Sequence, residues 1–213
     1  MGYPIRISVE GFVYHITVRG NGRSDIFLET RDFLRILKRL KEYKEKLKFF
    51  LYAYVLMPNH FHLLLEPTAR GTITKIMQTI NTAYTMYFNK KYSHVGHVFQ
   101  GRFHSIIVEK EPYLLEVSRY IHLNPVRAGL VTKPEDYSWS SYRTYLGKEK
   151  NPLIDTQLVL QLFSQTPEKQ KINYKEFVEA EIREPKFRLW ENISLKQFIA
   201  SDEFIKSTLK VRP

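Results

Sequence analysis

Residues 54–65 read Tyr54-Val55-Leu56-Met57-Pro58-Asn59-His60-Phe61-His62-Leu63-Leu64-Leu65. Two strongly apolar runs flank Pro58-Asn59, a pattern typical of two β-strands joined by a short turn. Side chains alternate between the two faces of a strand, so His60 and His62 share one face and Phe61 lies on the other. One metal ion could bridge two imidazoles placed in this way. The spacing fits a buried, hydrogen-bonded histidine pair equally well, and the pair alone does not decide.

The hydrophobic period along the chain predicts the elements around this hairpin. Alternation predicts strands, and a period of three to four residues predicts amphipathic helices. The predicted strands are 12–19, 48–57, 60–66 and 103–109, and the predicted helices are 30–46 and 72–91. The order strand, helix, strand, strand, helix, strand predicts an α+β fold, a ferredoxin-like sandwich (βαββαβ) with one antiparallel sheet and helices on one face.

The composition favours a polyanionic partner. Lys and Arg number 33 against 22 acidic residues in 213, which gives a net charge of +11 and makes nucleic acid the first partner to consider. The chain has no cysteine, which excludes disulfides and cysteine-based zinc sites. No apolar run approaches the roughly 20 residues of a membrane span, and the N-terminus lacks a signal-peptide core, so we expect a cytoplasmic protein without a membrane partner.

A second informative stretch, residues 111–125, has helical periodicity. Pro112 suits a first helical turn, and Pro125 is predicted to stop the helix. One face of this helix would carry Tyr113, Val117, Tyr120 and Asn124. From spacing alone, a core-packing face with a polar end residue is the simpler interpretation.

Five ordered segments give the sequence a more specific signature. They are Arg19-Gly20-Asn21, Met57-Pro58-Asn59-His60-Phe61-His62, Phe99-Gln100-Gly101-Arg102-Phe103, Arg119-Tyr120-Ile121-His122-Leu123-Asn124-Pro125-Val126-Arg127-Ala128-Gly129, and Trp139-Ser140-Ser141-Tyr142 followed by Tyr145-Leu146-Gly147. In these segments the chain resembles the single-tyrosine transposases of the IS200 type, most closely the REP-associated tyrosine transposase branch. The resemblance extends over residues 5–147.

The resemblance implies an enzyme, a metal-dependent single-strand DNA endonuclease and strand transferase. Tyr120 matches the nucleophile that forms a 5′-phosphotyrosine intermediate. His60 and His62 match the metal ligands of the His-hydrophobic-His (HUH) motif, and Asn124 matches the polar residue that completes the metal shell. Two imidazoles and an amide oxygen suit Mn²⁺ and tolerate Mg²⁺. The implied partner is single-stranded or hairpin DNA, and the sequence identifies no general base.

Other polar residues near the matched segments receive weaker assignments. We expect phosphate contacts from Arg19, Arg102, Arg119 and Arg127 as a group. His94 and His97 could extend a metal site, but an exposed loop is the better interpretation. His15 is predicted to be structural. His122 lies about 200° around the helix from Tyr120, which predicts that it does not share the site.

Beyond Gly147 the family signal fades, so we divide the chain into a catalytic domain, 1–147, and a helical C-terminal extension, 148–213. The extension is predicted to contain helices at 153–163, 170–183 and 195–209, with a break at 164–167. It could pack on the catalytic domain or contact DNA.

Two other functions fit parts of the pattern. A domesticated DNA-binding protein that no longer cleaves would keep the fold and the basic surface, although an intact set of His60, His62, Tyr120 and Asn124 argues against it. An RNA-binding protein on the same scaffold would expose aromatic residues on its central strands, where this chain has histidines. The sequence leaves open whether the protein is a monomer or a homodimer.

Overall fold

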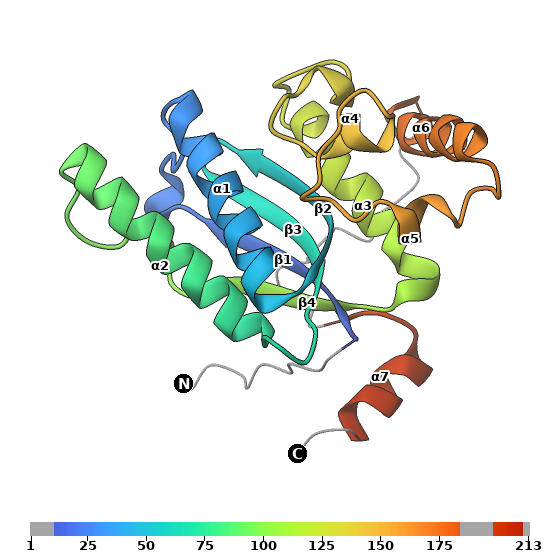
Figure 1. Ribbon diagram of the computed structural model, residues 1–213, viewed down its shortest axis with the longest axis horizontal. Coiled ribbons are helices and arrows are strands. Elements are labelled where there is room, and N and C mark those ends of the chain that lie inside the picture. The colour runs from blue at the N-terminus through green and yellow to red at the C-terminus, as the bar shows by residue number, and fades with distance from the viewer. Residues whose placement is uncertain (1–10, 184–197, 211–213) are drawn as a thin grey trace.

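The computed structural model describes residues 11–183 and 198–210, and one mixed sheet organises them (Figure 1). The strands are β1 (Val13–Arg19), β2 (Phe50–Met57), β3 (His60–Glu66), β4 (His104–Val108) and β5 (Phe198–Ile199). The helices are α1 (Thr30–Leu47), α2 (Ile73–Tyr92), α3 (Lys110–Arg127), α4 (Tyr142–Tyr145), α5 (Gln157–Leu160), α6 (Pro167–Arg183) and α7 (Asp202–Lys210). The sheet order is β2-β3-β1-β4-β5.

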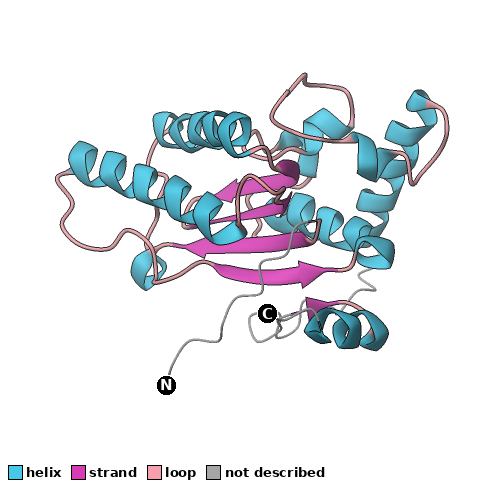
Figure 2. Ribbon diagram, turned by 60° about the horizontal axis from the view of Figure 1, so that its bottom comes forward, coloured by secondary structure: helices cyan, strands magenta, loops and turns pink. Residues whose placement is uncertain are grey.

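The predicted βαββαβ arrangement is confirmed for β1 to β4. These four strands pair antiparallel, and β1 lies between β3 and β4. The helices α1 and α2 pack against each other and cover one face of the sheet (Figures 1 and 2). Phe61 of β3 points to this face, where its ring is 6.4 Å from that of Phe27, itself 5.5 Å from Tyr84 of α2. The opposite face, which carries His60 and His62, is covered by α3.

Helix α1 is amphipathic. In α1 the apolar residues Phe33, Ile36 and Leu40 are buried, whereas basic residues alternate with them on the outside. Within residues 11–183 and 198–210, we find no helix with the length and hydropathy needed to cross a bilayer.

Asp32 joins the start of α1 to the end of α2. Its carboxylate accepts hydrogen bonds from the backbone N–H groups of Leu28 and Glu29 and from the hydroxyls of Tyr87 and Tyr92. Its Oδ1 also lies 2.6 Å from Nζ of Lys91. Burial alone would raise the pKa of Asp32, but the hydrogen bonds from Lys91, Tyr92 and the backbone outweigh burial and lower it.

Residues 137–155 cover the outer edge of β2, which would otherwise expose unpaired backbone groups. The Tyr137 and Tyr145 hydroxyls donate to the carbonyls of Leu56 and Tyr52 at 2.7 and 2.6 Å. Backbone bonds join Leu56 N–H to the Trp139 carbonyl and Ser141 N–H to the Tyr54 carbonyl. The Trp139-Ser140-Ser141-Tyr142 segment and Tyr145 therefore close the sheet on this side.

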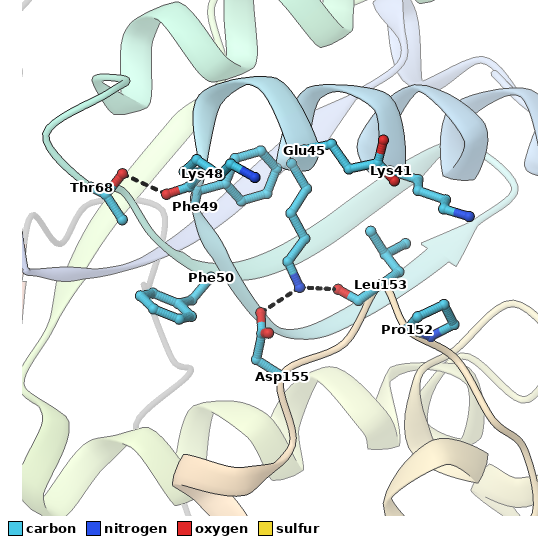
Figure 3. Close-up of a pocket in the computed structure, with 10 residues that line it drawn as sticks. Lys41, Glu45, Lys48, Phe49, Phe50, Thr68, Pro152, Leu153 and Asp155 are labelled. Carbon is cyan, nitrogen blue, oxygen red and sulfur yellow. Dashed lines mark hydrogen bonds and ion pairs between the residues drawn. The ribbon is translucent and has the colours of Figure 1, made fainter.

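At the start of β2 the C-terminal half of the chain is anchored to α1 (Figure 3). Nζ of Lys44 donates to the Leu153 carbonyl and to Asp155 Oδ2, at 2.7 and 2.6 Å, and Leu51 N–H donates to the same carboxylate oxygen. These contacts line a groove of about 370 Å³ whose wall includes the exposed ring of Phe50.

Several element predictions are wrong beyond residue 124. Pro125 does not stop α3, which runs to Arg127, because a proline in the last turn costs few helical hydrogen bonds and Ala128 N–H still reaches the Asn124 carbonyl. Residues 153–163 form only the short helix α5, since buried Leu153 and the bonds of Asp155 hold the preceding segment against β2. Pro167 belongs to α6 rather than to a break, which fits its preference for a first helical position.

The predicted helix 195–209 is also wrong at its start. Residues 195–197 lie outside the described residues, and Phe198–Ile199 form β5, which pairs in parallel with β4. Only Asp202–Lys210 are helical. The sheet is therefore mixed, with a fifth strand contributed by the C-terminal extension.

The Asp32 junction predicts a measurable loss of stability. We expect Asp32→Asn to lower the free energy of unfolding by about 2–4 kcal/mol, because buried donors and a partly buried ammonium lose their carboxylate. A carboxyl whose pKa is lower in the folded state stabilises above its unfolded pKa of about 3.9, so the difference from wild type should shrink as the pH falls below about 4. Urea unfolding at pH 7 and pH 3.5 measures both effects.

The matched control is Glu42→Gln on the same helix, which removes the surface ion pair with Arg39. Exposed pairs contribute about 0–1 kcal/mol. Equal losses in the two variants at pH 7 would contradict a special role for Asp32.

Candidate functional site

The candidate site lies on the face of the sheet that packs against α3. His60 and His62 both point there from β3, with ring centroids 5.1 Å apart. The ring of Tyr120, on α3, meets the ring of His62 edge-on at 5.6 Å. The structure therefore places the predicted nucleophile beside the predicted histidine pair of the same chain.

Asn124 completes this group from one turn farther along α3. Its Nδ2 donates to the Tyr120 carbonyl at 3.2 Å, and its side chain lies close enough to His60 to raise the pKa of that imidazole. Residues four apart lie on one helical face, which is why Tyr120 and Asn124 reach the sheet together. The residues predicted as nucleophile and metal shell thus converge.

The site includes three residues for which the sequence predicted no role at the site. His15 Nε2 lies 2.9 Å from His62 Nδ1, and Thr17 Oγ1 lies 3.1 Å from the same nitrogen. His60 Nδ1 is 2.6 Å from Asn59 Oδ1. His15, predicted to be structural, also meets the Tyr120 ring at 5.8 Å. Alternation along β1 places His15 and Thr17 on one face, but only the strand register, with Thr17 opposite His62, brings them to the site.

These contacts orient the imidazoles. Asn59 Nδ2 donates to the Arg23 carbonyl, so its Oδ1 faces His60 and accepts the proton on His60 Nδ1. A neutral imidazole donates from one nitrogen only, which leaves His60 Nε2 with a lone pair. His62 Nδ1 contacts His15 Nε2 and Thr17 Oγ1, and the tautomer with its proton on Nδ1 would leave His62 Nε2 in the same state. This is the arrangement in which an outer hydrogen bond fixes the tautomer of a metal-binding histidine.

Burial keeps the histidines neutral. It lowers the pKa of His15 to about 3, with a smaller effect from His104. For His60, burial followed by the charge of Arg19 lowers the pKa to about 4, against an opposing hydrogen bond with Asn124. The pKa of His62 lies well below its usual range, first because of burial and then because of His15, His60 and Arg19. Neutral imidazoles are the form that binds metal.

Three loops meet at the end of the sheet that carries His60. Gly20 N–H donates to the Asn59 carbonyl, Asn21 N–H to the Val98 carbonyl, and Gln100 N–H to the Arg19 carbonyl. A Cβ on Gly20 would lie 2.1 Å from the Ser24 carbonyl oxygen, so this position requires glycine. The segments around Arg19 and Phe99–Phe103 therefore form the rim of the site.

The four predicted DNA-binding arginines occupy different environments. Arg19 is exposed on β1 opposite His60, and Arg102 is exposed on the rim. Arg119 forms ion pairs with Glu116 and with Glu181 of α6. Arg127 pairs with Glu181 at 3.6 Å, and its guanidinium carbon lies 5.2 Å from the centroid of the Tyr120 ring.

The remaining candidate histidines lie elsewhere. His94 and His97 are exposed, and His94 Nδ1 contacts Asn89. His122 is buried away from Tyr120, with Nδ1 2.7 Å from the Tyr174 hydroxyl and Nε2 2.8 Å from Ser141 Oγ. The prediction that His122 lies outside the site is confirmed. Its hydrogen bonds tie α3 to α6 and to the segment that covers β2.

A metal at this site would depend on the amide of Asn124. Within residues 11–183 and 198–210, no three His, Cys, Asp or Glu side chains gather closely enough to hold an ion by themselves. The donor set of two imidazole nitrogens and one amide oxygen still fits a divalent cation that keeps water or phosphate ligands. The groove beside Phe50 is not part of this site, because Phe50 pairs with Glu66 and Met57 with His60, at opposite ends of the β2-β3 hairpin.

A known protein family matches the part of the chain that contains these site residues. A family model described as "Transposase IS200 like" matches residues 8–124, a span that includes His60, His62, Tyr120 and Asn124. The chain belongs to the IS200-like transposase family. None of the curated protein sequences matches this IS200-like chain.

One solved structure supports the fold, and a second is reported for comparison. The structure of a REP-associated tyrosine transposase bound to a REP hairpin aligns with a TM-score of 0.59 and 21% identity, over 73% of this chain and 93% of that one. A crystal structure of a Deinococcus radiodurans protein, provisionally described as a transposase, aligns with a TM-score of 0.40 and 17% identity, over 57% of this chain and 94% of that one. At this identity the first match confirms the predicted fold.

The buried histidines predict a distinctive titration. At pH 7 without metal, we expect the rings of His15, His60 and His62 to be neutral, with protonation of His60 only near pH 4. Since their pKa values are lower in the folded state, the stability that depends on neutral rings should be kept above about pH 6.5 and lost as the pH falls below it, by about 1.4 kcal/mol per pH unit for each ring. Two-dimensional ¹⁵N–¹H NMR of the imidazoles reports charge and tautomer.

If His60 and His62 became protonated near pH 6.5, the ordinary pKa of an imidazole, the site would be more hydrated than the structure shows.

Proposed function

We propose that this IS200-like protein cleaves and rejoins single-stranded DNA, using Tyr120 as the nucleophile. The observation that carries the proposal is the contact of the Tyr120 ring with His62, from one chain, together with Asn124 beside His60. A core-packing tyrosine would not require an amide one turn later or two neutral imidazoles with oriented tautomers. Burying four polar groups against an apolar sheet is costly unless hydrogen bonds or a bound ligand satisfy them.

His60, His62 and Asn124 are the residues that would hold a divalent ion, Mn²⁺ or Mg²⁺. Such an ion neutralises negative charge on the phosphate and helps to orient it. The protein prepares this site in advance: Asn59 orients His60, and His15 with Thr17 orients His62.

In the proposed reaction, the Tyr120 hydroxyl oxygen attacks the phosphorus of a DNA phosphodiester. The new bond joins the tyrosine oxygen to the phosphorus, and the bond from phosphorus to the 3′ oxygen breaks. The phenol proton is lost and the departing 3′ oxygen gains a proton, so the products are a 5′-phosphotyrosine and a free 3′-hydroxyl. The phosphodiester energy is kept in the covalent intermediate, which lets a later 3′-hydroxyl displace Tyr120 without a nucleotide cofactor.

The surroundings of the site suit a DNA strand. Arg19 and Arg102 on the rim can contact phosphates. The net charge of +11 favours association with a polyanion and predicts strong salt dependence. The structural neighbour was solved with a REP hairpin, which supports hairpin DNA as the first substrate class to test.

Covalent trapping tests the proposal. We expect the wild-type protein, labelled hairpin DNA with a single-stranded flank, and Mn²⁺ to give an adduct that survives denaturing electrophoresis. Tyr120→Phe should abolish it, and His60→Ala or chelation of the metal should reduce it at least 100-fold, because phosphate charge would be left uncompensated.

The matched control is Tyr113→Phe, which changes a tyrosine two turns earlier on the same helix. It should keep the adduct. An adduct that persists in Tyr120→Phe would exclude Tyr120 as the nucleophile, and binding without any adduct across hairpin substrates and metals would leave a DNA-binding protein.

A further inference from the structure

Arg127 lies seven residues after Tyr120, two turns along the same face of α3. Its guanidinium carbon is positioned over the Tyr120 ring, 5.2 Å from the centroid. This is a cation–π arrangement, in which the positive charge is attracted to the face of the aromatic ring. The rings of His15 and His62 lie nearly perpendicular to the same ring, with centroid distances of 5.8 and 5.6 Å. The ring is therefore contacted by two strands of the sheet and by its own helix.

Arg127 is held by α6, which belongs to the C-terminal extension. Glu181 Oε1 lies 3.6 Å from the Arg127 guanidinium, and Glu181 Oε2 lies 3.4 Å from that of Arg119. The Glu181 side chain is only 4% exposed. A carboxylate at such depth is tolerated when cations pair with it, and two arginines of α3 do so.

A second contact fixes the same part of α6 to α3. The Arg119 guanidinium lies over the ring of Phe177, 4.3 Å from its centroid, and donates to the Phe177 carbonyl. Deeper in the interface, the Tyr174 hydroxyl contacts Ser118 and His122. Glu181 therefore projects from a helix that is packed against α3, and this packing holds its carboxylate in place.

We propose that Arg127 is a positioning residue for Tyr120 and that Glu181 of the extension holds Arg127 in place. This inference rests on the proposed function and adds to it. Guanidinium contact with the ring face restricts rotation of the phenol and keeps its oxygen directed toward the site. The role differs from a DNA phosphate contact, which Glu181 would oppose by occupying the guanidinium. It also makes α6 a functional part of the active site.

Spectroscopy of Tyr120 tests the contact without requiring activity. 3-Fluorotyrosine is placed at position 120 of the full chain, and ¹⁹F NMR is recorded for the unsubstituted background and for Arg127→Met, Arg127→Lys and Glu181→Gln. We expect Arg127→Met to shift and broaden the resonance, Arg127→Lys to restore it in part, and Glu181→Gln to move it in the direction of Arg127→Met. An unchanged resonance in Arg127→Met would overturn the proposal.

The matched control is Lys175→Met, which removes a cation of α6 whose ion pair with Glu179 is partly exposed. It should leave the resonance in place. Circular dichroism and thermal melting confirm that each variant is folded. If Arg127→Met or Glu181→Gln does not fold, the test uses Arg127→Lys, which keeps the positive charge.

Kinetics separate positioning from DNA binding. At saturating hairpin DNA, we expect the single-turnover rate of adduct formation to fall roughly 10- to 100-fold in Arg127→Met, with an intermediate rate in Arg127→Lys. The Kd for DNA, measured without metal, should change less than about twofold. Weaker binding with a normal rate at saturation would overturn the positioning role. No adduct from the wild-type protein would refute the proposed function, whereas the ¹⁹F spectra would still decide the Arg127 contact.

Discussion

The packing of α3 against the histidine-bearing face of the sheet is the contact on which the site depends. His15 and His62 are buried on adjacent strands, where an unsatisfied imidazole would cost several kcal/mol. The hydrogen bond between the two rings satisfies one nitrogen of each, and the Tyr120 ring covers both of them. A helix at any other angle would leave the histidines open to water and would move Tyr120 and Asn124 away from them. The position of α3 that shields the buried histidines is therefore also the position that the proposed chemistry requires.

Contacts elsewhere in the molecule hold α3 and the sheet in this position. Gly20 allows the loops after β1 and β2 to meet, which fixes Arg19 opposite His60. Residues 137–155 close the edge of β2, and α6 packs behind α3 through Tyr174 and Glu181. The C-terminal extension is thus joined to the preceding part of the chain both at α3 and at the sheet, where β5 pairs with β4.

The sequence was sufficient to predict the fold of the first two thirds of the chain and the main residues of the site. Period-two and helical patterns depend on local residues, and β1 to β4 with α1 and α2 follow from them. His60, His62, Tyr120 and Asn124 were predicted together because the family resemblance linked two distant segments. Their convergence is now seen in the structure, while their metal binding and catalysis stay predictions.

The parts that could not be predicted depend on long-range contacts. The roles of His15 and Thr17 follow from the register of β1 on β3, which one strand alone does not encode. The short strand β5 exists because β4 offers a free edge, and the helix predicted from residue 153 begins later because Lys44 and Leu51 bind Asp155. Arg119 and Arg127 were assigned to DNA from their charge, whereas their partner Glu181 lies more than 50 residues away in the sequence.

The most direct test of the account is complementation between two inactive variants. Tyr120→Phe and His60→Ala are mixed at equal concentration, allowed to exchange subunits, and assayed with labelled hairpin DNA and Mn²⁺, beside wild-type protein diluted with Tyr120→Phe. Because Tyr120 meets His62 of its own chain, the account predicts no covalent adduct from the mixture and a proportionate adduct from the diluted wild type. A mixture that regains the adduct would show that the tyrosine serves the histidines of another chain and would contradict the account.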